Sequence, residues 1–69
     1  MEKDKKMTAD QFKEARRALG LSQSQLGAVL DTAPRTVRKW ETGERSPNPI
    51  AVQAMTWFLR GFRPEGWPK

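Results

Sequence analysis

The sequence predicts an all-α fold, a compact bundle of four short helices. Residues that start and stop helices alternate along the chain, and the apolar residues between them recur at helical spacing. The alternation of a strand is not seen in any segment. With 69 residues the chain forms one domain with a small core. We expect this domain over 8–61, between a flexible N-terminal tail over 1–7 and a C-terminal tail over 62–69.

The first two predicted helices begin with the same pair of residue types. Thr8-x-x-Gln11 and Ser22-x-x-Gln25 both fit a capping box, in which a hydroxyl and an amide satisfy free backbone N–H groups at a helix start. The first helix is expected to run to about Leu19, where Gly20 provides a left-handed stop. The second begins at Gln23 and spans about two turns.

A proline opens each of the last two predicted helices. Pro34 and Pro49 occupy the first helical position, which tolerates a missing N–H, and Asn48 caps the fourth helix. Glycines follow both helices. The third helix is therefore expected to end at Gly43, and the fourth to run from Pro49 to about Arg60.

Composition narrows the class of function. Lys and Arg total 13 against 8 acidic residues, a formal charge of +5, which suits a polyanion such as nucleic acid or an acidic membrane surface. The basic residues are spread over several capped helices, which argues against a membrane-surface peptide. Without His or Cys, the commonest general base, nucleophile and metal ligands are missing. We expect no enzyme, cofactor or metal site.

Localisation is expected to be cytoplasmic. No apolar stretch approaches the roughly 20 residues that span a bilayer. The charged first residues do not resemble a secretory signal.

The third predicted helix carries a basic stripe. Its outward positions at helical spacing are Arg35, Arg38, Lys39 and Thr42, opposite Val37, Trp40 and Glu41. Cationic side chains donate to guanine O6 and N7 or to phosphates, and a threonine hydroxyl suits either target. Such a stripe is also typical of an ordinary solvated face. The preceding two-turn helix and short connection form a helix-turn-helix, which favours the DNA interpretation.

At these residues the chain resembles a known family. The runs LGLSQSQL from Leu19 and RTVRKWETG from Arg35 resemble the lambda-repressor-like (Cro/Xre-type) helix-turn-helix domain, in matching order over about residues 8 to 60. The resemblance implies that double-stranded DNA is bound in the major groove. It implies base reading by Arg35, Arg38 and Lys39. The phosphate-binding positions that it implies are Gln23, Thr36, Thr42 and Arg45.

The resemblance also implies a structural ion pair between Arg16 and Glu41, and helical periodicity already makes Glu41 an inward-facing acid that needs a partner. This chain departs from the family pattern at several positions. Asp31 replaces the usual glycine of the turn, and Ala33 replaces the usual serine or threonine cap. Gly27 lies where the family has a small residue, at a cost of up to about 1 kcal/mol relative to alanine.

The fourth predicted helix is apolar almost all round. We expect Ile50, Ala54, Trp57 and Phe58 to face the core. The second apolar face and the tail then form a predicted dimer interface, made of Val52, Met55, Leu59, Phe62 and Trp67. In the alternative, the tail folds back and covers this helix within one chain. A third interpretation makes Trp67 a base-stacking platform.

The resemblance implies a sequence-specific transcriptional regulator. Its expected form is a homodimeric repressor of phage or mobile-element type, such as a regulator of an anti-CRISPR operon, bound to an inverted-repeat operator. The alternative is an antitoxin or adaptor whose main role is to bind a protein partner through the fourth helix and the tail.

Overall fold

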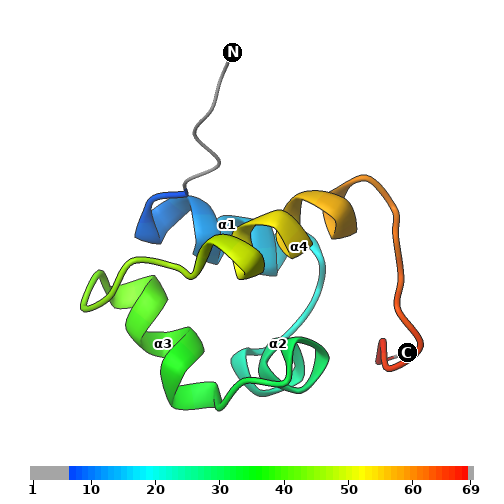
Figure 1. Ribbon diagram of the computed structural model, residues 1–69, viewed down its shortest axis with the longest axis horizontal. Helices are drawn as coiled ribbons and strands as arrows, with labels where there is room; N and C mark the ends of the chain where they lie inside the picture. Colours follow the sequence, from blue (N-terminus) through cyan, green and yellow to red (C-terminus); the bar gives the residue numbers. More distant parts are fainter. Residues whose placement is uncertain (1–6, 69) are drawn as a thin grey trace.

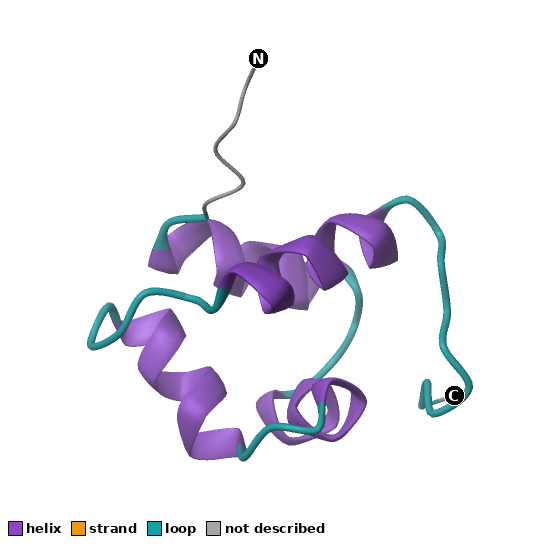
Figure 2. Cartoon of the chain, viewed as in Figure 1, coloured by secondary structure: helices purple, strands orange, loops and turns teal. Residues whose placement is uncertain are grey.

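The computed structural model describes residues 7–68, which contain four helices and no strand. The helices are α1 (Ala9–Ala18), α2 (Gln23–Leu30), α3 (Pro34–Thr42) and α4 (Pro49–Leu59). Figure 1 shows α1 and α4 lying together on one side of the molecule, with α2 and α3 on the other. Short loops join the helices (Figure 2). The predicted all-α fold is confirmed, and each helix end lies within one residue of its expected position.

Both predicted capping boxes are present. The Thr8 hydroxyl accepts from the Gln11 N–H at 3.1 Å, and the Gln11 side chain accepts from the Thr8 N–H at 3.0 Å. At the start of α2 the corresponding bonds between Ser22 and Gln25 measure 3.0 and 2.9 Å. Asn48 accepts from the N–H of Ile50 at 2.7 Å. These caps satisfy N–H groups that a helix leaves free at its start.

One small core joins the four helices. Phe12 of α1, Leu26 of α2, Val37 of α3 and Met55 of α4 are fully buried. The ring of Phe12 meets that of Trp40 edge to face, with centroids 5.5 Å apart, a favoured arrangement for aromatic pairs. This packing holds α3 against the rest of the bundle from its inner face.

The turn between α2 and α3 depends on a close backbone approach. The N–H of Thr32 donates to the carbonyl of Gly27 at 2.7 Å. A Cβ atom placed on Gly27 would lie 2.5 Å from the Thr32 carbonyl oxygen. Asp31 adopts the left-handed conformation, with φ of 58°, that glycine usually supplies. The small residue in α2 is therefore a steric requirement of the turn that positions α3.

The predicted orientation of α4 is right for Phe58, which is buried, and for Leu59, which is exposed, but wrong for four other residues. Val52 and Met55, assigned above to a dimer interface, are buried in the chain's own interior, while Ile50 and Trp57, assigned to the core, are exposed. The core face also includes Ala51 and Phe58. No side chain from Pro49 to Leu59 is charged, and the two polar ones, Gln53 and Thr56, are partly buried, so the sequence marks the outward face only weakly. Packing against α1 and the shared core decides the orientation instead.

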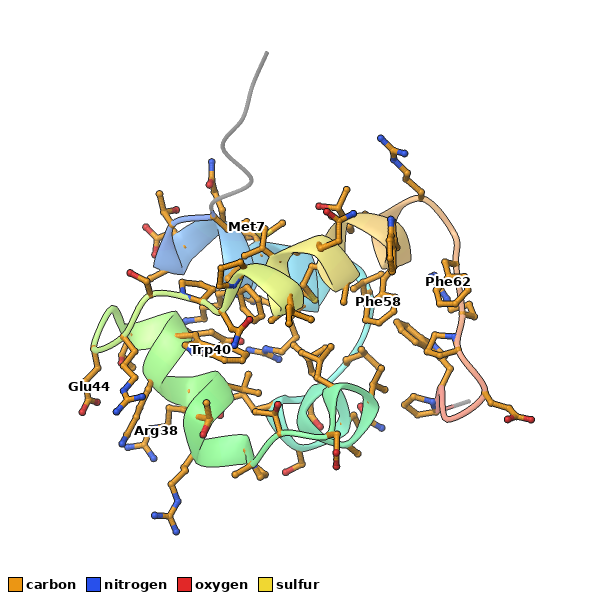
Figure 3. The ribbon with its side chains drawn as sticks, viewed as in Figure 1. Met7, Arg38, Trp40, Glu44, Phe58 and Phe62 are labelled. Carbon is orange, nitrogen blue, oxygen red and sulfur yellow. The ribbon has the colours of Figure 1, made fainter. Side chains whose placement is uncertain are left out.

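The C-terminal tail leaves the end of α4 and runs down one side of the bundle (Figure 3). Trp67 is half-buried, and its ring meets Phe58 edge to face with centroids 5.0 Å apart. Arg63 donates to the carbonyls of Phe58 and Phe62 at 2.6 and 2.9 Å, and its guanidinium lies 4.3 Å from the Trp67 ring centroid. The intramolecular alternative therefore describes Trp67 better than the assignment to a dimer interface does.

Candidate nucleic-acid interface

The outward face of α3 carries the basic stripe expected from the sequence. Arg35, Arg38 and Thr42 are exposed and Lys39 is half-buried, whereas Val37, Trp40 and Glu41 are buried on the inner face. Figure 3 shows Arg38 pointing away from the bundle and Trp40 pointing into it. Because the inner face is held by the core, α3 presents its cations on a fixed support. Such a helix suits the major groove, which admits one α-helix.

The predicted ion pair joins α1 to α3. Arg16 Nε donates to Glu41 Oε2 at 2.7 Å and Nη2 donates to Oε1 at 3.1 Å. The third nitrogen, Nη1, donates to the carbonyl of Leu21 at 2.8 Å. The side chains are 13% and 2% exposed, respectively. The bidentate geometry, typical of strong arginine–carboxylate pairs, confirms the pair and fixes the helix-turn-helix against α1.

Gln23 is tied to this ion pair. Its Nε2 donates to Glu41 Oε1 at 3.1 Å, which the sequence analysis did not predict. An amide nitrogen carries two N–H groups, and within residues 7–68 we find no acceptor for the second. Gln23 is also the first residue of α2, where free N–H groups and the helix dipole favour phosphate. The geometry is compatible with its predicted role in phosphate binding.

The other predicted phosphate-binding residues lie in different surroundings. Thr42 is part of the stripe, and its hydroxyl donates to the Lys39 carbonyl at 3.2 Å. The backbone N–H of Arg45 donates to the same carbonyl at 3.2 Å, while its side chain is exposed. Thr36 is half-buried and lines a separate hollow between α3 and α4, beside Asn48. The structure thus groups Thr42 and Arg45 with the stripe and places Thr36 apart from it.

An acidic residue also reaches this surface, and sequence reasoning missed it. Glu44 lines one open hollow together with four residues of the stripe, Arg35, Arg38, Lys39 and Thr42. Helical periodicity does not place Glu44, because α3 ends before it. Its position directly after the helix-ending Gly43 was the available signal.

The fold, the turn and the cationic outer face of α3 together define a helix-turn-helix DNA-binding domain. A sequence model of the helix-turn-helix family, of Cro/C1 and lambda-repressor-like type, matches residues 12–56. The chain belongs to this family and is a DNA-binding transcription regulator of Xre type. No curated protein and no solved structure matches the chain. Within the part of the chain that the structure describes, no helix has the length and apolar character to cross a membrane.

Proposed function

We propose that the protein is a cytoplasmic, operator-binding repressor that reads an inverted repeat as a homodimer and catalyses no reaction. The observation that carries this proposal is the outer face of α3, where Arg35, Arg38 and Lys39 stand on a helix whose inner face is locked into the core. Arginine and lysine there can donate to guanine O6 and N7. The narrowest form of the proposal is a regulator that belongs to a phage or mobile element and controls, for example, an anti-CRISPR operon. This assignment rests on the family resemblance alone.

The surface of α4 supports the dimer. The exposed large apolar side chains of residues 7–68 are Ile50, Trp57, Leu59 and Phe62, at 78, 50, 49 and 54% exposure, respectively. All four lie on α4 or just after it, and none of the α4 side chains is charged. An apolar surface on a chain of charge +5 marks the face where a second copy can approach with least repulsion. The proposed dimer interface keeps Leu59 and Phe62 from the interface predicted from the sequence. In it, Ile50 and Trp57 take the place of Val52 and Met55.

The test is selection of bound sites from a random double-stranded DNA pool, followed by sequencing. An enriched inverted repeat, with half-sites about 10 base pairs apart, is expected for a dimer with one α3 in each successive major groove. A single half-site would support sequence-specific binding by a monomer and remove the dimer. Affinity that is equal for random DNA and for the best selected site would overturn the regulator itself.

A second candidate function is favoured by the same exposed side chains. An antitoxin or adaptor would use the α4 surface, with Trp57 and Phe62, to hold a different protein. This function predicts weak sequence preference on DNA, a monomer in isolation, and a stoichiometric partner that co-purifies from the native host. The salt dependence of DNA binding adds a further discriminator, because each phosphate contact of an operator complex releases counterions and steepens the loss of affinity with salt.

A further inference from the structure

Glu44 is held at the DNA-facing surface rather than on a free loop. Gly43 ends α3 with φ of 86°, which turns the chain back at the helix end. The N–H of Arg45 then donates to the Lys39 carbonyl at 3.2 Å. This bond holds residues 44–45 against the last turn of α3. Glu44 therefore borders the hollow that also contacts Arg38 and Lys39, and Figure 3 shows both Glu44 and Arg38 directed outward.

The carboxylate of Glu44 differs from that of Glu41 in its surroundings. Glu41 is buried and neutralised by Arg16. Glu44 is exposed, and within residues 7–68 no cation lies within the 4.0 Å of an ion pair to it. Its negative charge thus remains available at a surface that must approach phosphates. It weakens binding to every DNA sequence unless a hydrogen-bond donor on the DNA meets it.

Donors are scarce on the duplex. Phosphate and sugar oxygens accept, and so do guanine N7 and O6 and thymine O4, so a carboxylate facing any of them is repelled. In the major groove the donors are the exocyclic amines of cytosine and adenine. Adenine places the acceptor N7 beside its amine, where it opposes the second carboxylate oxygen, while cytosine has no acceptor on that edge. Cytosine is therefore the base that best offsets the cost of placing a carboxylate in the major groove.

We propose that Glu44 is a specificity-determining residue, which accepts a hydrogen bond from the N4 amine of a cytosine in the operator. The inference rests on the proposed function and deepens it, because it adds an acceptor to a surface otherwise made of donors. The cations of α3 favour guanine, and Glu44 selects a cytosine at one further position in each half-site. Binding at other sequences is disfavoured by the same charge.

The experiment compares three chains in site selection from a random pool: the wild type, Glu44→Gln, and Glu65→Gln as a charge-matched control on the tail. For the wild type we expect a cytosine preference that Glu44→Gln reduces about tenfold at one position per half-site, with the other positions unchanged. Glu44→Gln should also bind random DNA more tightly than the wild type. Glu65→Gln should keep the wild-type base preferences.

Two outcomes would overturn the inference in different ways. If Glu44→Gln binds all sequences more tightly but selects the wild-type site, Glu44 acts as a repulsive charge and reads no base. If the wild type itself enriches no sequence, the proposed function fails and the inference fails with it. The selection with the wild type alone distinguishes this outcome from a failure of the inference about Glu44. Equal thermal midpoints for the three chains would establish that the comparison concerns folded protein, as expected for changes at exposed positions.

Discussion

Arg16 and Glu41, 25 residues apart in the sequence, form a bidentate ion pair in which Nε and Oε2 are 2.7 Å apart. The pair joins α1 to α3, so it helps to hold α3 in position.

Glu41→Ala should lower the stability of the fold. The substitution leaves the guanidinium of Arg16, itself 13% exposed, without its carboxylate, and breaking a buried pair in this way costs about 3 kcal/mol or more. The free energy of unfolding from denaturant titration measures the effect. Glu14→Ala, which removes an exposed acid from α1, is the control and should leave stability nearly unchanged. Equal stabilities for the two variants would show that the pair contributes nothing.

Gly27→Ala should destabilise the protein although alanine is the better helix former. The new Cβ would lie 2.5 Å from the Thr32 carbonyl oxygen, so the turn must shift, at a cost of about 1–3 kcal/mol. That cost exceeds the gain in helix propensity, up to about 1 kcal/mol. Gly66→Ala, where a Cβ meets nothing within 4 Å, is the matched control. A thermal midpoint higher than that of the wild type would contradict the steric argument.

Arg38→Ala should relax base preference. If the guanidinium donates to a guanine in the major groove, its loss costs about 1–3 kcal/mol and removes discrimination at that position. Binding to the selected operator and to single-base variants of it measures the loss. Arg17→Ala removes an exposed charge on α1 and should weaken all sites equally, if at all. A selected site identical to that of the wild type would exclude a base-reading role for Arg38.

Ala33→Ser should stabilise the protein. Ala33 is the cap of α3, with the extended backbone that a cap requires, but its side chain makes no hydrogen bond there. A serine hydroxyl could accept from a free N–H, for a gain of about 1 kcal/mol, or a rise of about 4–8 °C in the thermal midpoint. Ala28→Ser, at an exposed position within α2, should lower the midpoint slightly. The explanation fails if both substitutions change the midpoint in the same direction.

Trp57→Lys should prevent dimer formation without unfolding the chain. Trp57 is half exposed, so a lysine is tolerated in the monomer, whereas two lysines facing each other across a two-fold axis repel. Stoichiometry and cooperativity on the selected inverted repeat measure the effect, with Ala28→Lys as a control that adds the same charge away from α4. Cooperative binding by Trp57→Lys, like that of the control, would place the dimer contact elsewhere.

Local signals in the sequence predicted most of the fold. The capping boxes at Thr8 and Ser22 and the stop at Gly43 act over a few residues, so they can be identified without knowing the tertiary structure. Periodicity on α3 likewise placed Arg38 outside and Trp40 inside, as observed.

The remaining features depend on packing between distant segments. On α4 both faces are largely apolar, and the choice between them required the positions of α1 and the shared core, so Met55 and Trp57 were exchanged between core and surface. The approach of Thr32 to Gly27 and the bond from Gln23 to Glu41 follow from how α2 lies against α3. Glu44 was missed because it follows the helix, where spacing no longer indicates direction.

The bond between Gln23 and Glu41 has a consequence for the entropy of binding. Gln23 is ordered by a carboxylate that Arg16 in turn orders, and this arrangement exists before any DNA is present. A flexible side chain that must be immobilised on association costs about 0.5–1.5 kcal/mol. Here folding has already restricted the amide, so a phosphate that meets its second N–H encounters a preorganised donor. If Gln23 contacts a phosphate as predicted, the ion pair between Arg16 and Glu41 therefore strengthens DNA binding indirectly, by ordering that donor before the duplex arrives.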